Sequence, residues 1–120
     1  MIISAMLLAA MVPLVGERLP NAGTTIRLKL PDEITPSMGP YRDCKLQAVG
    51  AIVTGLDGKK LPKMAKRGGD CTPYRIKAVA DADVALRALG KTDPERSAEI
   101  AKAVEDIDNF AAELKRLQGG

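Results

Sequence analysis

Two helical patterns follow one another with a very short connection in the C-terminal part of the chain, and they constrain the fold most strongly. The first is expected over residues 72–89, because Thr72 and Pro73 suit a helix start and Gly90 suits a helix end. Its apolar side chains share one face. The residues of that face are Val79, Ala82, Leu86 and Leu89, flanked by Ala78 and Ala85.

The second pattern predicts a longer helix over residues 94–117. Thr92 and Glu95 have the spacing of a capping box at its start. Apolar residues then recur at spacings of three and four, which is typical of an amphipathic helix. They are Ile100, Ala103, Val104, Ile107, Phe110, Ala111, Leu114 and Leu117. Because residues 90–93 are so few, we expect an antiparallel αα-hairpin, although the same stripe would also suit the seam of a weak homodimer.

The N-terminal half carries weaker signals. Residues 37–49 are expected to be helical, with Thr35 as the cap and Gly50 as the stop. Residues 24–30 alternate polar and apolar side chains, which is typical of a strand, and residues 51–54 are the best candidate for its partner. Residues 55–58 carry a turn signal, so a short β-hairpin is possible beside a mainly α fold.

Cys44 and Cys71 are the only cysteines, and they lie too far apart in sequence for a CxxC redox pair. In an exported chain such a pair is expected to form a disulfide, which would close a loop of 28 residues (44 to 71 inclusive) and stabilise the fold by roughly 3–4 kcal/mol. The alternative is a reactive thiol at Cys71, because Lys66, Arg67 and a helix start lie near it in sequence. Tyr41 and Tyr74 lie close to these cysteines in sequence and suit packing around a bridge.

Residues 1–16 form an apolar run without a charge. This run is shorter than the roughly 20 residues that span a bilayer, and it resembles the apolar part of a secretory signal peptide. Residues 1–23 are therefore expected to direct export, and residues 24–120 to form one small domain. A retained membrane anchor is the alternative, although no Lys or Arg precedes the run.

The chain contains no histidine, which removes the commonest general base and metal ligand. Glycines at 50 and 55 have the spacing of a phosphate-binding loop, but Leu56 stands where that motif needs lysine. Glu105 and Asp108 could share a cation on one helix face, although a solvated face is the simpler expectation. We predict no catalytic residue, cofactor or metal site.

The segment 59–77 concentrates seven cationic residues against the single carboxylate of Asp70. An anionic membrane surface or another polyanion could bind there, whereas a nucleic acid is not expected because the segment lacks aromatic residues interleaved with its cations for base stacking. The candidate anion-binding residues are Lys59, Lys60, Lys63, Lys66 and Arg67, with Arg75 and Lys77 beyond them.

The resulting hypothesis is a small exported, non-enzymatic structural or protein-binding module, either monomeric or weakly dimeric. The first alternative is a membrane-anchored or membrane-surface accessory protein that uses the basic segment 59–77. The second alternative is a thiol-dependent protein that uses Cys71.

Overall fold

The computed structural model describes residues 27–55 and 57–118, and its regular elements in this part of the chain are helical. A short 3₁₀ helix, η1, spans Asp32–Ile34. Three α-helices follow: α1 spans Thr35–Ala48, α2 spans Thr72–Ala88 and α3 spans Asp93–Leu117. The prediction of a mainly α fold is confirmed. Residues 1–23, which carry the predicted export signal, lie outside the described residues.

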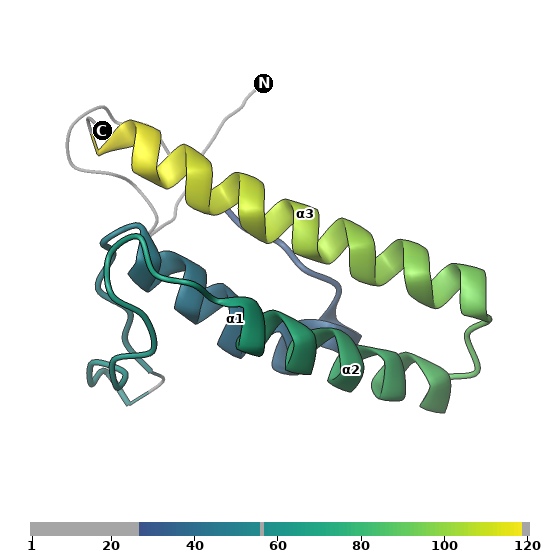
Figure 1. The fold of residues 1–120 in the computed structure, drawn as a ribbon. Coiled ribbons are helices and arrows are strands. Elements are labelled where there is room, and N and C mark those ends of the chain that lie inside the picture. The colour runs from purple at the N-terminus through teal and green to yellow at the C-terminus, as the bar shows by residue number, and fades with distance from the viewer. Residues whose placement is uncertain (1–26, 56, 119–120) are drawn as a thin grey trace, which may run out of the picture.

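The three α-helices all contact one another, and η1 packs against α1 and α2. Figure 1 shows α1 and α2 along one side of the molecule, with the chain turning back after α2 so that α3 extends over both. A long loop joins α1 to α2 and projects from one end of the molecule, far from the turn between α2 and α3.

The core is mainly aliphatic, because the whole chain has only two tyrosines, one phenylalanine and no tryptophan. Its largest fully buried side chains are Ile34, Met38, Leu86, Ile107 and the half-cystine Cys44. Most of the predicted α3 stripe is buried within the chain, including Ile100, Ala103, Val104 and Ala111. The stripe thus packs against other helices of the same chain, which is the first of the two uses predicted for it from the sequence.

Local signals fix most helix ends. Gly90 has φ 81°, and its backbone N–H donates to the Arg87 carbonyl (2.9 Å) while that of Lys91 donates to the Leu86 carbonyl (3.2 Å). This Schellman motif ends α2 where the glycine predicts. The capping box is also confirmed, because the Glu95 N–H donates to Thr92 Oγ1 and the Thr92 N–H donates to the Glu95 carboxylate.

Three sequence expectations about the helices need correction. Leu89 is 60% exposed rather than buried, because it is the C-cap of α2 and has left the helical face. Thr35 and Thr72 already belong to their helices instead of capping them. The Thr35 hydroxyl donates to the Pro31 carbonyl, and the start of α2 is held by Asp70, whose Oδ1 accepts from the N–H and the hydroxyl of Thr72.

The predicted pairing of residues 24–30 with residues 51–54 is not found among the described residues. Residues 27–30 form no strand, and Leu28 and Leu30 instead pack their side chains against the helical core. Residues 24–26 lie outside the description. The turn signal at 55–58 does mark a chain reversal, with one antiparallel bridge between Thr54 and Lys60. Within the described ranges, no helix is long and apolar enough to cross a bilayer.

Candidate anion-binding site

A disulfide between Cys44 and Cys71 joins α1 to the start of α2, as predicted. Both residues are buried, and their Cα atoms lie 5.9 Å apart, within the usual range for a bridge. The reactive-thiol interpretation of Cys71 therefore does not describe the oxidised protein. The bridge closes a loop that contains all five of the candidate cations at positions 59–67.

The loop is also fastened to the end of α1 by the side chain of Gln47. Its Nε2 donates to the Pro62 carbonyl (3.1 Å), and its Oε1 accepts from the backbone N–H groups of Met64 (2.7 Å) and Ala65 (3.2 Å). The Gly68 N–H donates to the carbonyl of Ala48 (2.7 Å). The backbone of residues 62–68 is thus held against the helices, and Met64 and Ala65 pack on the core.

The cationic side chains of this loop are exposed at the molecular surface. All five are accessible, and none makes an ion pair with any residue that the structure describes. Four of them share the lining of a cavity of about 450 Å³ at the end of α1, and its lining among the described residues contains no carboxylate. These four cations are Lys60, Lys63, Lys66 and Arg67, and we call the space that they line the cationic cavity.

Two features of the cavity were not anticipated from sequence. Ile52 also lines it and is 74% exposed, so a large apolar side chain lies among the cations. The Arg67 guanidinium lies over Gly50, where the Cβ of any larger residue would come within 2.6 Å of the arginine Cζ. The close approach of this cation to the carboxyl end of α1 complements the helix dipole.

The C-terminal end of the basic segment 59–77 is helical. Residues 72–77 belong to α2, as the predicted helix over residues 72–89 implies, so Arg75 and Lys77 lie outside the loop. The Lys77 Nζ lies 2.9 Å from the Asp81 carboxylate one turn away, which partly neutralises it. The candidate site is therefore confined to the loop before Cys71.

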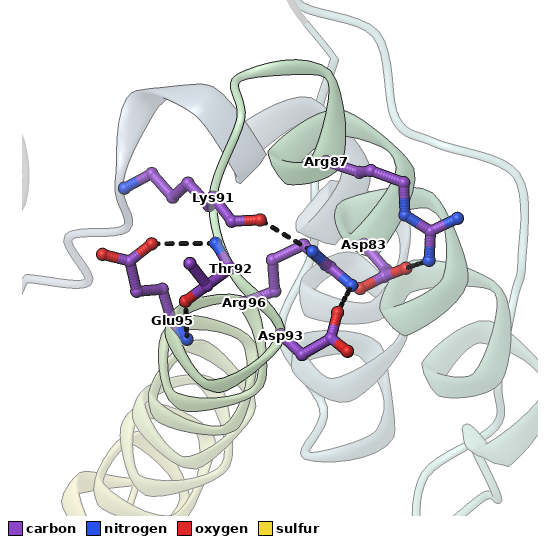
Figure 2. Close-up of polar contacts among 7 residues, drawn as sticks. All are labelled: Asp83, Arg87, Lys91, Thr92, Asp93, Glu95 and Arg96. Carbon is purple, nitrogen blue, oxygen red and sulfur yellow. Dashed lines mark hydrogen bonds and ion pairs between the residues drawn. The ribbon is translucent and has the colours of Figure 1, made fainter.

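A second polar cluster lies at the turn between α2 and α3, far from the loop, and Figure 2 shows its side chains converging on Arg96. Arg96 is only 9% exposed. Its Nε donates to Asp83 (2.7 Å), its Nη1 donates to the Lys91 carbonyl (2.7 Å), and its Nη2 contacts Asp93. Arg87 adds a second donor to Asp83 (2.9 Å). We call this arrangement the α2–α3 corner.

The corner shifts the pKa values of Asp83, Glu95 and Arg96 in the direction of the ionised form. The Arg96 hydrogen bond holds the pKa of Asp83 below its ordinary value of 3.8, and the Arg87 charge adds to this. The Thr92 backbone N–H and hydroxyl lower the pKa of Glu95 in the same way. The donors of Arg96 and Arg87 are directed at partners within the fold, so the role of this cluster is structural.

The pair Glu105 and Asp108, weighed as a shared cation site, is used differently. Asp108 accepts a hydrogen bond from the buried Tyr41 hydroxyl (2.6 Å) and lies 3.7 Å from Lys45 Nζ, whereas Glu105 is exposed. Burial, with a smaller contribution from Asp108, raises the pKa of Tyr41 well above its ordinary value. In residues 27–55 and 57–118, no group of three or more acidic or cysteine side chains is placed to hold a metal ion.

An open groove of about 1080 Å³ runs between α2 and α3. Val79, Ile100 and Val104 supply apolar wall, and Asp83 and Lys102 also line it. Ile76 and Val84 are also exposed on α2. The groove is lined by charges of both signs, and none of its described lining residues holds a buried polar atom without a partner. The groove therefore indicates no particular ligand or reaction.

Sequence reasoning found the five loop cations but missed the residues that organise them. Gln47 reads as an ordinary helical residue, and only the fold brings it against the loop. Ile52 reads as part of a strand, so it was expected to be half-buried. The sequence gives a partial indication of the ion pairs of Arg96, because this arginine follows a short turn and lies close in sequence to the carboxylates of Asp93 and Glu95.

The chain was compared with known proteins in three ways. No family model matches it, no curated protein matches it, and no solved structure matches it.

Proposed function

We propose that this protein is a small exported, non-enzymatic binding module that recognises an anionic partner through the cationic cavity. The observation that carries the proposal is the contrast in charge pairing. The loop cations are exposed without ion pairs among the described residues, as are the isolated Lys29, Arg75 and Lys115. Eight other cations are paired: Arg42, Lys45, Lys77, Arg87, Lys91, Arg96, Lys102 and Arg116. Unpaired like charges gathered on a fixed backbone repel one another and favour a bound anion.

The proposed exported location rests on two supports. The apolar run at residues 1–16 resembles a signal peptide, and the disulfide suits an oxidising compartment. The absence of histidine from the sequence supports a binding rather than a catalytic role.

We further propose that α2 and α3 act as an antiparallel αα-hairpin that serves as scaffold, with α1 and the disulfide attaching the binding loop to it. The short connection at residues 89–92 and the α2–α3 corner support this arrangement. In this scheme the scaffold contributes rigidity, and the loop contributes recognition.

Retention of the oxidised protein on heparin–agarose tests the proposal. We expect elution at a salt concentration well above that of a Lys60→Ala/Lys63→Ala variant, because each removed cation weakens the electrostatic attraction. The matched control is Lys77→Ala/Lys115→Ala, which removes the same net charge outside the cavity. Equal elution of the two double variants would show that only net charge matters and would contradict a specific site.

A further inference from the structure

We infer that the anionic partner is the surface of an anionic phospholipid bilayer, and that Ile52 inserts into it while the cationic cavity binds lipid phosphates. This inference rests on the proposed function and names its ligand. The observation behind it is the juxtaposition of one 74% exposed isoleucine with Lys60, Lys63, Lys66 and Arg67 around a single cavity.

The charge of the cavity suits phosphate groups. Its described lining residues include four cations and no carboxylate, so none of them opposes a bound lipid phosphate with a negative charge. A negatively charged membrane attracts basic residues near its surface strongly enough to change the affinity roughly fivefold for each Lys or Arg. Several such side chains on one short loop therefore act together.

The exposed isoleucine favours a bilayer over a soluble polyanion. Ile52 is the most exposed of the large apolar side chains among the described residues, and it lies in the loop region rather than on a helix. A sulfated or phosphorylated polymer offers charge alone, whereas the boundary between headgroups and acyl chains offers charge and an apolar layer side by side. Only the second environment removes the Ile52 side chain from water.

The attachment of the loop gives the inference its structural basis. The disulfide, the Gln47 side chain and the bond from Gly68 to the Ala48 carbonyl hold the loop backbone, so the cations and Ile52 need no large rearrangement to meet a surface. Because a held loop loses less conformational freedom on binding, its affinity exceeds that of the same residues in a free peptide.

The test measures partitioning of the full oxidised chain onto two kinds of vesicle, phosphatidylcholine alone and phosphatidylcholine mixed with phosphatidylglycerol. The neutral vesicles report any contribution from residues 1–16, which is common to all variants. We expect the Lys60→Ala/Lys63→Ala variant to lose roughly 25-fold in preference for the mixed vesicles. We expect Ile52→Ser to lose roughly tenfold on the mixed vesicles and nothing on heparin–agarose.

Ile76→Ser is the matched control for the apolar substitution, because Ile76 is 66% exposed on α2 and lies outside the cavity. If Ile52→Ser and Ile76→Ser bind mixed vesicles equally, the bilayer inference is overturned, while retention on heparin would leave the proposed function standing. If the unaltered protein binds neither mixed vesicles nor heparin, both are overturned. If it binds heparin but not mixed vesicles, the partner is a soluble polyanion and the lipid assignment fails.

Discussion

Charged residues serve opposite purposes at the two ends of α2. Beyond its C-terminal end, the α2–α3 corner surrounds Arg96 with two carboxylates and a carbonyl, and the arginine is nearly inaccessible to solvent. Before its N-terminal end, the loop carries Lys60, Lys63 and Arg67 in solvent with no ion pair among the described residues. Charge at the corner holds the chain together, whereas charge in the loop remains available for another molecule.

The difference teaches how a small aliphatic fold can hold a charged surface in place. Repulsion among the loop cations is unfavourable, and no carboxylate of the part of the chain that the structure describes lines their cavity to compensate it. The covalent bridge and the Gln47 hydrogen bonds offset this repulsion. Substitutions in the α2–α3 corner and in the loop can be compared to separate the structural use of charge from the binding use. The expected effects are given in decreasing order.

The largest effect is expected from removing the disulfide with Cys44→Ala/Cys71→Ala. In the chain-entropy account, a closed loop of this length contributes roughly 3–4 kcal/mol to the free energy of unfolding. Urea unfolding followed by circular dichroism measures the loss, and treatment of the unaltered protein with reductant should reproduce it. An unchanged unfolding midpoint would show that the loop is held without the bridge.

The second prediction compares two arginines directly. Arg96→Ala leaves Asp83 and the Lys91 carbonyl without their buried donor, so we expect the Tm to fall by several degrees. Arg67→Ala loses only a solvent-exposed interaction with the α1 dipole, so it should lower the Tm much less and should reduce heparin retention instead. Differential scanning fluorimetry and salt elution measure the two properties. A similar Tm loss for both variants would contradict the division between structural and binding charge.

The third prediction concerns Tyr41, whose hydroxyl links α1 to Asp108 of α3. Tyr41→Phe should cost about 1 kcal/mol at neutral pH, because one hydrogen bond to a partly exposed carboxylate is lost. Since burial raises the folded-state pKa of Tyr41, the stability that it contributes is present below pH 10.0 and declines as the pH rises above that value.

Urea unfolding at neutral pH and above pH 10 checks both statements about Tyr41. The phenylalanine variant should lose less stability than the unaltered protein over the alkaline interval. Tyr74→Phe is the matched control, since the described residues show no hydrogen bond from its hydroxyl. An alkaline loss of the same size in all three proteins would rule out Tyr41 as its source.

The smallest effect is expected from Asp83→Asn, measured as a function of acid pH. Because the pKa of Asp83 is lowered in the folded state, the stability that its carboxylate contributes is fully present above pH 3.8. This stability is lost as the pH falls through the folded-state pKa. Asp83→Asn should therefore flatten the acid limb of the Tm-against-pH curve. In an Arg96→Ala background the flattening should shrink markedly, and a full effect there would assign the pKa shift to another group.

The sequence alone determined the features that depend on neighbouring residues. Gly90 and the Thr92–Glu95 box define the ends of two helices, because capping bonds join residues a few positions apart. The disulfide could be predicted because two cysteines allow a single pairing within the chain. The exposed cations could also be predicted, since a run of Lys, Gly and Pro has too little apolar surface to bury itself.

Only the tertiary structure decided how these parts serve one another. The alternation over residues 24–30 predicts a strand, yet Leu28 and Leu30 pack against helices, which offer the same apolar contact without β-sheet hydrogen bonds. The burial of Arg96, the hydrogen bonds from Gln47 to the loop and the exposure of Ile52 beside four cations all join residues distant in sequence. Such contacts depend on where the helices pack, and no local pattern encodes that position.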